Sequence, residues 1–274
     1  MRLIDGKAIA AAIEVGLGDG WPAGPPVLAV LTTAEDEASR WYLRSIQRAA
    51  GRVGIVVRVE TLEGADGPAI ADRLDALSAD PGVHAIICET PLPGGVALAE
   101  VGAHIAPGKD VDGANPVSLG RLAAGLPAFA PATAAAVLEI LRSEKVPLEG
   151  AMAVVVGRSV VVGKPVALLL LAENATVTLC HSRTIGLADV CAQADVLVVA
   201  AGRPGLIGAE YIKAGAVVID VGTNPGPGGK LVGDVDMAGA SAAAALTPVP
   251  GGVGQVTTMV LMRHVTQAAA RCLP

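Results

Sequence analysis

AMAVVVGRSVVVG, residues 151–163, is the stretch that decides the fold. It begins with an almost unbroken run of Ala and Val, which is typical of a strand buried on both faces of a parallel sheet. The run leads directly into Gly157, as expected for a tight turn between a strand and a helix. Further strands are predicted over 176–179, 196–200 and 217–221, with helical connections between them. The second half of the chain is therefore predicted to be a dinucleotide-type α/β fold.

The first half of the chain shows the same alternation of predicted strands and helices. Strands are predicted over 27–31, 55–59 and 84–88, and helices over 37–53 and 68–78. Between 117 and 131 the composition changes to Gly, Pro and small residues, which is where domain boundaries tend to fall. We therefore predict two domains, 1–116 and 117–274, and a last helix over 257–271 that is able to pack against either of them.

The composition limits the class of protein. Of the 274 residues 52% are hydrophobic but only 2% aromatic, so the interior must consist of Val, Leu, Ile and Ala. A net charge of −6 argues against a nucleic-acid partner, and the absence of a long apolar run argues against a membrane span. The N-terminus does not resemble a secretory signal, so we expect a cytoplasmic protein that acts on small molecules.

The cysteines carry no metal-site pattern. Their spacing contains no CxxC pair, and no His stands at metal-ligand spacing from them. We expect no metal, and we interpret the cysteines as buried free thiols of a reducing compartment. The four are Cys88, Cys180, Cys191 and Cys272.

The turn after the 151–156 strand is the predicted phosphate site, although Ser159 replaces the middle glycine of the usual GxGxxG pattern. The next strand ends at Leu179 without the carboxylate that would hold the ribose of NAD. Arg158, Ser182 and Arg183 instead offer donors for a 2′-phosphate, which favours NADP over NAD, although Arg183 fits a solvated loop equally well. The predicted cofactor residues are Gly157, Arg158, Ser159, Val162, Gly163, His181, Ser182, Arg183, Ala201, Gly202, Gly222 and Thr223.

Several segments together resemble the methylenetetrahydrofolate dehydrogenase/methenyltetrahydrofolate cyclohydrolase family. They are PLP at 91–93, KDVDG at 109–113, VGRSVVVGKP at 156–165, ATVTLCHS at 175–182 and TPVPGGVG at 247–254. The resemblance implies two α/β domains flanking a cleft, with the folate on the N-terminal domain and a Rossmann-like NAD(P)-binding domain at the C-terminus. It also implies a homodimer.

The resemblance further implies roles for individual residues. Tyr42, Glu89 and Asp112 match catalytic positions, although Tyr42 alone would also fit surface packing and Asp112 a turn carboxylate. The substrate-binding positions are Ser39, Tyr42, Pro91, Leu92, Asp112, Pro250, Gly251, Gly252 and Thr257.

This sequence departs from the family at three places. The catalytic Lys of the family falls four residues after the Tyr, where this chain has Ile46. The family's Gln before PLP is Glu89, and the Pro-Cys-Thr-Pro segment reads Pro131-Ala-Thr-Ala134. Hydride loss from 5,10-methylenetetrahydrofolate requires orientation, whereas hydrolysis of the methenyl product requires an acid/base group. We therefore expect NADP-dependent oxidation to the methenyl compound, with weak or absent cyclohydrolase activity.

Three alternatives remain at this stage. Glu89 could act as the base, which would preserve both activities. The chain could be a non-catalytic folate or dinucleotide binder whose active site has decayed. It could also be a dehydrogenase for a different one-carbon carrier.

Overall fold

The computed structural model describes residues 1–17, 21, 24–33 and 37–271, and these residues form two compact units. The large-sheet unit consists of residues 1–11 and 133–257. The small-sheet unit consists of residues 12–132 and those from 258 onward. Both units have parallel sheets, so the expected α/β fold with two domains is confirmed. No helix among the described residues is long and apolar enough to cross a membrane.

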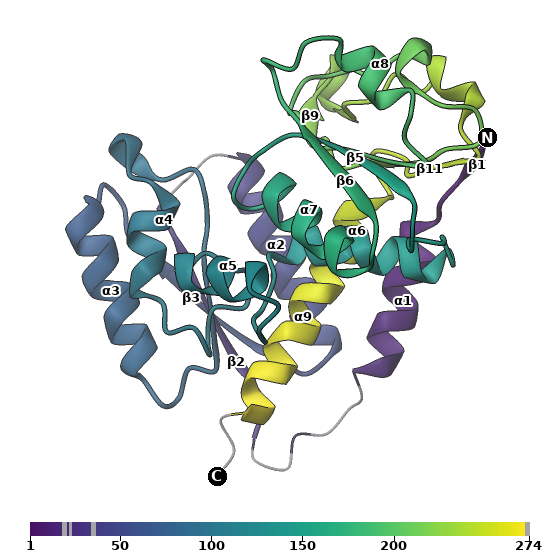
Figure 1. Cartoon of the computed structure of the whole chain (residues 1–274). Coiled ribbons are helices and arrows are strands. Elements are labelled where there is room, and N and C mark those ends of the chain that lie inside the picture. The colour runs from purple at the N-terminus through teal and green to yellow at the C-terminus, as the bar shows by residue number, and fades with distance from the viewer. Residues whose placement is uncertain (18–20, 22–23, 34–36, 272–274) are drawn as a thin grey trace. The chain divides into compact units, whose positions relative to one another are not determined.

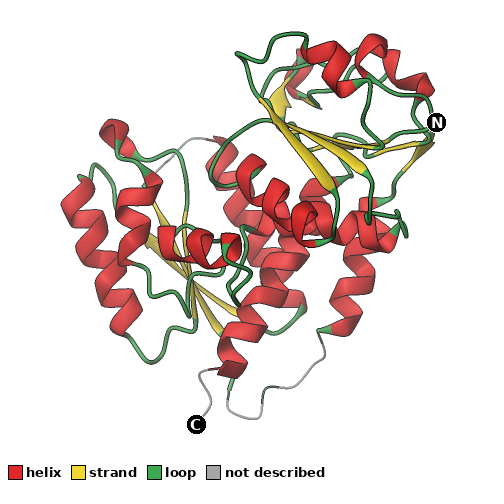
Figure 2. Cartoon of the chain, viewed as in Figure 1, coloured by secondary structure: helices red, strands yellow, loops and turns green. Residues whose placement is uncertain are grey.

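The large-sheet unit is built on a parallel sheet in the order β1-β11-β8-β7-β5-β6. Every residue of β7 is buried, which explains its unbroken Val and Leu sequence. Helices lie on both sides of this sheet (Figure 2). The strands are β1 (Arg2–Leu3), β5 (Met152–Val156), β6 (Thr176–Cys180), β7 (Val196–Val199), β8 (Val217–Asp220) and β11 (Ala245–Leu246), with an antiparallel pair β9 (Asn224–Pro225) and β10 (Leu231–Val232). The helices include α7 (Gly163–Ala172) and α8 (Leu187–Cys191), with 3₁₀ turns at Ala209–Tyr211, Pro227–Gly229 and Gly239–Ala242.

The small-sheet unit has the strand order β3-β2-β4, again parallel. Helix α3 packs on this sheet through Ile70, Leu74 and Leu77, whose spacing places them on one helix face. Helix α4 lies beside α3 (Figure 1). The strands are β2 (Val27–Thr32), β3 (Val56–Thr61) and β4 (Ala85–Cys88). The helices are α2 (Glu37–Arg52), α3 (Gly67–Ala79), α4 (Leu98–Val101) and α5 (Pro116–Ala123), with 3₁₀ turns at Pro93–Gly95 and Gly102–His104.

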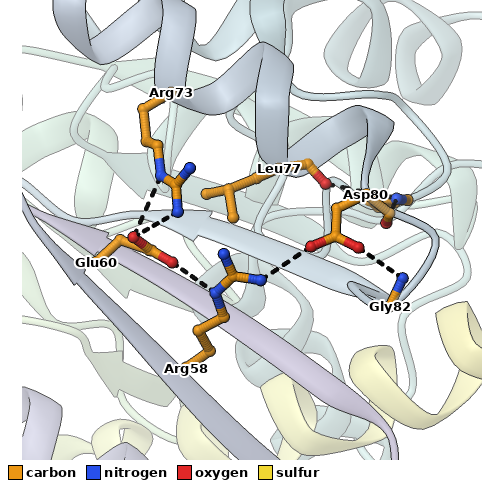
Figure 3. A network of polar contacts seen from close by, with 7 residues as sticks. Arg58, Glu60, Arg73, Leu77, Asp80 and Gly82 are labelled. Carbon is orange, nitrogen blue, oxygen red and sulfur yellow. Dashed lines mark hydrogen bonds and ion pairs between the residues drawn. The ribbon is translucent and has the colours of Figure 1, made fainter.

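The edge strand β3 carries a polar network that ties it to α3 (Figure 3). Arg58 contacts Glu60 at 2.6 Å and Asp80 at 2.9 Å, and Arg73 contacts Glu60 at 2.8 Å. Burial raises the pKa of the Glu60 carboxyl. The hydrogen bonds from Arg73 and Arg58 outweigh this effect and hold the pKa below its usual value. Charged side chains on an edge strand discourage pairing with another chain, so this network protects the edge as well as joining two elements.

Three helices run from one unit into the other along the chain: α1 (Gly6–Gly16), α6 (Ala132–Ser143) and α9 (Val253–Arg271). The division differs from the one expected at Pro116, because residues 116–132 stay with the small-sheet unit. The Ser118 hydroxyl donates to Asp110 at 2.5 Å, and the Ala132 amide donates to Asp112 at 2.8 Å. The N-terminus also differs, since β1 pairs with β11 and thereby joins residues 1–11 to the large-sheet unit.

The described cysteines behave as expected from the sequence. Cys88, Cys180 and Cys191 are free and buried, whereas Cys272 lies outside the described residues. Burial, followed by the charge of Glu89, raises the pKa of the Cys88 thiol to about 12. Burial likewise raises the pKa of Cys191 to about 12. Because thiolates are the reactive form, these side chains serve as packing groups.

Candidate functional site

Three of the predicted catalytic residues come together in the small-sheet unit. Tyr42 lies on α2, Glu89 follows β4 directly, and Asp112 lies in the loop before α5. Burial raises the pKa of the Tyr42 phenol, and the negative charges of Asp112 and then Glu89 raise it further. Tyr42 therefore stays protonated and can donate a hydrogen bond. A neutral phenol thus lies within electrostatic range of two acidic side chains.

Asp112 is held by the segment 131–134. Its Oδ1 accepts a hydrogen bond from the Ala132 amide at 2.8 Å. Gly113 has φ of 63°, and a Cβ there would lie 2.7 Å from Pro131 Cδ, so only glycine fits the turn. Burial raises the pKa of the Asp112 carboxyl to about 6, despite the opposing effect of the Ala132 hydrogen bond. Asp112 therefore changes charge close to neutral pH.

The two acids of KDVDG have different surroundings. Asp110 is buried and accepts hydrogen bonds from the Ser118 hydroxyl at 2.5 Å and the Asn115 amide at 3.0 Å. Its partners all belong to the turn and the start of α5, so Asp110 shapes the loop. Asp112 is the acid placed near Tyr42.

Ile46, the position at which we expect a lysine in the family, lies one helical turn after Tyr42 and is fully buried. The small-sheet unit contains a single lysine, Lys109. Its Nζ donates to the Asp80 carbonyl at 2.7 Å and to the Leu77 carbonyl at 3.5 Å. The ammonium of Lys109 is therefore engaged by backbone carbonyls near the end of α3.

His264 is a buried histidine that the sequence did not single out. Its Nδ1 lies 2.9 Å from the Val111 carbonyl, which can only accept, so Nδ1 carries the proton. Burial lowers the pKa of His264 to about 4, and its ring lies 5.2 Å from that of Phe129. The neutral imidazole therefore anchors the residue next to Asp112 to helix α9.

The remaining predicted substrate residues are divided between the units. Ser39 is buried on α2, Pro91 is exposed, and Leu92 packs against the core of the small-sheet unit. Pro250, Gly251, Gly252 and Thr257 belong instead to the large-sheet unit. There a Cβ on Gly252 would lie 2.5 Å from the Pro248 carbonyl oxygen, and the Thr257 hydroxyl donates to Val253 at 3.1 Å. The tight turn before α9 thus has a structural requirement for its glycine.

The glycine turn after β5 has the close packing that the sequence predicts. A Cβ on Gly157 would lie 2.2 Å from the Ala200 carbonyl oxygen, and one on Gly163 would lie 2.0 Å from the Gly157 carbonyl oxygen. Ser159 Oγ accepts from the Val162 amide at 3.1 Å and the Gly163 amide at 3.4 Å. Two amides at the start of α7 are therefore satisfied by the residue that replaces the middle glycine.

The tip of β6 carries no carboxylate. After Cys180 the chain forms a closed turn in which the His181 amide donates to Thr184 Oγ1 at 2.9 Å and the Arg183 amide to His181 Nδ1 at 3.1 Å. Ser182 and Arg183 are exposed there, and Arg158 is exposed after the neighbouring strand β5. Both arginines thus lie at one edge of the sheet.

The loops after β7 and β8 contain Ala201, Gly202, Gly222 and Thr223, at the same carboxyl edge of the sheet. The sequence did not reveal what holds them. Asp234, fully buried, accepts hydrogen bonds from the amides of Ala201 at 2.6 Å and Gly202 at 2.9 Å. No group of three His, Cys, Asp or Glu among the described residues could hold a metal ion.

These features define a class: an α/β protein with a glycine turn at the edge of a parallel sheet in one unit and a pair of acids beside a tyrosine in the other. The family follows from comparison. Residues 4–112 match the model of the tetrahydrofolate dehydrogenase/cyclohydrolase catalytic domain, and residues 131–273 match the NAD(P)-binding domain of the same family. The chain belongs to this family, and the resemblance found in its motifs is confirmed.

Individual relatives cover nearly the whole chain. A protein of Parafrankia sp. (strain EAN1pec) named bifunctional protein FolD is 58% identical over 98% of this chain and 99% of its own length. The bifunctional FolD of Campylobacter jejuni has a similar structure, with a TM-score of 0.94, 35% identity and complete coverage of both chains. The Trypanosoma brucei FolD, solved with NADP and an inhibitor, has a TM-score of 0.91 and 36% identity, covering 98% of this chain and 97% of its own.

Proposed function

We propose that this enzyme oxidises 5,10-methylenetetrahydrofolate to 5,10-methenyltetrahydrofolate with NADP, and that it hydrolyses the product weakly or not at all. The first part is supported by family membership and by the Trypanosoma brucei relative solved with NADP. The observation that carries the whole proposal is the site around Tyr42. It contains two acidic residues, and Ile46, to which the resemblance assigns the place of a family lysine, is a buried isoleucine.

The residues at the edge of the large sheet fit a dinucleotide. Gly157 and Gly163 lie so close to backbone carbonyls that neither position has room for a Cβ, which fits the tight turn of a dinucleotide site. Arg158, Ser182 and Arg183 are exposed donors suited to a 2′-phosphate, and no carboxylate at the tip of β6 would repel it. When bound, the nicotinamide supplies the hydride acceptor.

The residues of the small-sheet unit then have separate roles. Asp112, when ionised, accepts hydrogen bonds from the pterin and fixes its orientation. Tyr42 donates from its protonated phenol and its ring borders the folate. Glu89 contributes a negative charge beside the one-carbon centre, where hydride loss creates a cation stabilised by the adjacent ring nitrogens. Pro250, Gly251, Gly252 and Thr257 are also proposed to border substrate and nicotinamide.

Hydrolysis of the methenyl product makes a different demand. Water must lose a proton and a ring nitrogen must gain one, which requires a group that titrates near the working pH. Ile46 cannot transfer a proton, and Lys109 is bound to carbonyls near the end of α3. Asp112 titrates near neutral pH, but in this proposal it is committed to the pterin. Because general acid/base help is typically worth on the order of 10² to 10⁴ in rate, its loss is enough to separate the two activities.

The alternative with both activities assigns the base to Glu89, which is buried directly after β4. It predicts that Glu89→Gln abolishes hydrolysis and spares much of the hydride transfer. Our proposal predicts the opposite sensitivity, because the negative charge assists cation formation: Glu89→Gln lowers the rate of NADP reduction and leaves the negligible hydrolysis unchanged.

The first experiment supplies the purified protein with methylenetetrahydrofolate and either NADP or NAD in parallel, and follows reduction of the cofactor. The expected result is faster reduction of NADP. Binding of both ligands without turnover would instead indicate a non-catalytic relic. Turnover only with another one-carbon carrier would overturn the substrate assignment.

A further inference from the structure

Asp234 accepts hydrogen bonds from four donors, although sequence patterns assign it no role. It is fully buried, just after β10. Oδ2 accepts from the amides of Ala201 at 2.6 Å and Gly202 at 2.9 Å. Oδ1 accepts from the Arg203 amide at 2.8 Å and from Asn224 Nδ2 at 2.8 Å. Three of these donors are consecutive backbone amides of the loop that follows β7.

Consecutive amides that curl around one point form a nest, which is an arrangement that proteins use to bind anions. Gly202 has φ of 64°, the left-handed conformation that such a curl requires. In this chain the anion is the Asp234 carboxylate itself. The amides of the loop are therefore occupied by the protein, and the negative charge behind them disfavours a phosphate at this loop.

A second acid fixes Asp234 in place. Asp220, the last residue of β8, accepts from the amides of Gly222 at 2.9 Å, Asp234 at 3.0 Å and Val235 at 3.0 Å. The fit leaves no room for side chains: a Cβ on Gly233 would lie 1.9 Å from Asp220 Oδ2, and one on Gly222 would lie 2.6 Å from Asp234 Cγ. Since β7 and β8 are neighbours, the two acids join the loops that follow adjacent strands.

We propose that Asp234 is a positioning residue that sets the loop of Ala201, Gly202 and Arg203 in the shape that receives the uncharged part of the dinucleotide and keeps phosphate away from it. The inference rests on the proposed use of a dinucleotide at this edge of the sheet. It predicts that Asp234 acts on dinucleotide affinity and hardly on the rate of the bound enzyme.

The test is Asp234→Ala in the full chain, measured by calorimetric binding of NADP and by steady-state kinetics. Removing the carboxylate leaves the three amides and the Asn224 amide group without their acceptor, so the loop loses its fixed shape. We expect NADP to bind at least about tenfold more weakly, with a matching rise in KM and a kcat within about threefold of the unmodified protein.

Chemical rescue separates positioning from general damage. Formate fits a nest that has lost its carboxylate, so it should restore a large part of the NADP affinity of Asp234→Ala, whereas chloride at the same ionic strength should not. Asp234→Asn keeps the shape of the side chain and one acceptor oxygen, so it should lose less NADP affinity than Asp234→Ala. It also serves as the test variant if the alanine variant does not fold. Asp236→Ala is the matched control, because Asp236 is exposed and accepts from the Ala238 amide in its own turn.

The outcomes are distinguishable. Unchanged NADP affinity in the folded Asp234→Ala or Asp234→Asn variant would overturn the inference while leaving the proposed function intact. So would a loss confined to kcat, or a loss in Asp234→Ala that formate does not reverse. Failure of the unmodified protein to bind NADP would overturn the proposed function itself, and would be seen before any variant is made.

Discussion

Asp234 in the large-sheet unit and Asp112 in the small-sheet unit are both acids held by backbone amides, but their surroundings differ. Asp234 is fully buried and accepts from three amides and from Asn224. Asp112 keeps part of its surface exposed, accepts from Ala132, and lies within range of Tyr42. An acid whose acceptor sites are filled by the chain becomes part of the scaffold, whereas one that retains acceptor capacity beside other polar groups can serve a ligand.

The largest effect is expected from placing an amine at position 46, in the small-sheet unit that contains the acid we assign to the ligand. Ile46→Lys should raise methenyltetrahydrofolate hydrolysis by on the order of 10² or more, because it introduces a titrating group one helical turn after Tyr42. The site is fully buried, so the variant should also unfold at a lower temperature. Ile46→Met, which keeps volume without charge, is the control and should gain no hydrolysis. An Ile46→Lys protein that folds but hydrolyses no faster would show that more than the amine has been lost.

A second prediction concerns the tightly packed glycine turn of the large-sheet unit. Gly163→Ala places a Cβ 2.0 Å from the Gly157 carbonyl oxygen, so the turn after β5 must open. Such overpacking typically costs about 1 to 3 kcal/mol in the free energy of unfolding, and NADP binding should fall with it. Gly120→Ala is the matched control, because nothing lies within 4 Å of a Cβ at that position in α5. Denaturant unfolding should find the control at least as stable as the unmodified chain.

The pH dependence sharpens the role of Asp112. With a pKa of about 6, the carboxyl is protonated below that pH and loses its capacity to hold the pterin donors. We expect KM for the folate to rise up to about tenfold per pH unit below 6. The profile should flatten in Asp112→Asn. An unchanged KM between pH 7 and 5 in the unmodified enzyme would contradict this role.

The raised pKa of Asp112 affects stability in the opposite direction from substrate binding: low pH weakens binding but favours the folded state. Because the folded pKa of Asp112 is raised above that of the unfolded chain, its contribution to stability is fully present below about pH 4. It is lost as the pH rises through about 6. Asp112→Asn should therefore gain melting temperature relative to the unmodified protein at pH 8, and lose that advantage at pH 4. Thermal unfolding at both pH values measures the difference.

The smallest expected effect lies at the exposed edge of the large sheet. Arg183→Ala should lower the preference for NADP over NAD by about tenfold or less, because a solvated arginine contributes only part of the phosphate recognition. Parallel titrations with the two cofactors measure it, and Arg203→Ala, in the loop after β7, serves as a comparison on the same sheet edge. Equal loss of affinity for both cofactors would remove Arg183 from 2′-phosphate recognition.

Much of the fold was predictable because its signals are local. The valine strands around β5 and the helix periodicity of α2 and α3 depend on residues close in the chain. The two-residue strand β1 was not predictable, since its partner β11 lies near the other end of the sequence and two residues carry no periodicity. Its pairing moves the N-terminus into the large-sheet unit.

The site was predictable only where side chains form a motif. Tyr42, Glu89 and Asp112 were found because they fall in segments that resemble a family. Asp234 and His264 were missed because most of their hydrogen-bond partners are backbone groups: the amides of the loop after β7, and the Val111 carbonyl. A hydrogen bond to the backbone places no requirement on the partner's side chain, so it leaves no pattern in the sequence.

We propose that hydride transfer and hydrolysis are separate activities in this chain and that only the first is strong. The most direct measurement follows the methenyl product after NADP reduction has stopped, in the presence of the purified unmodified protein and in buffer alone. We expect rapid formation of methenyltetrahydrofolate and a decay no faster than in buffer. Decay in step with its formation, catalysed by the unmodified enzyme, would contradict it.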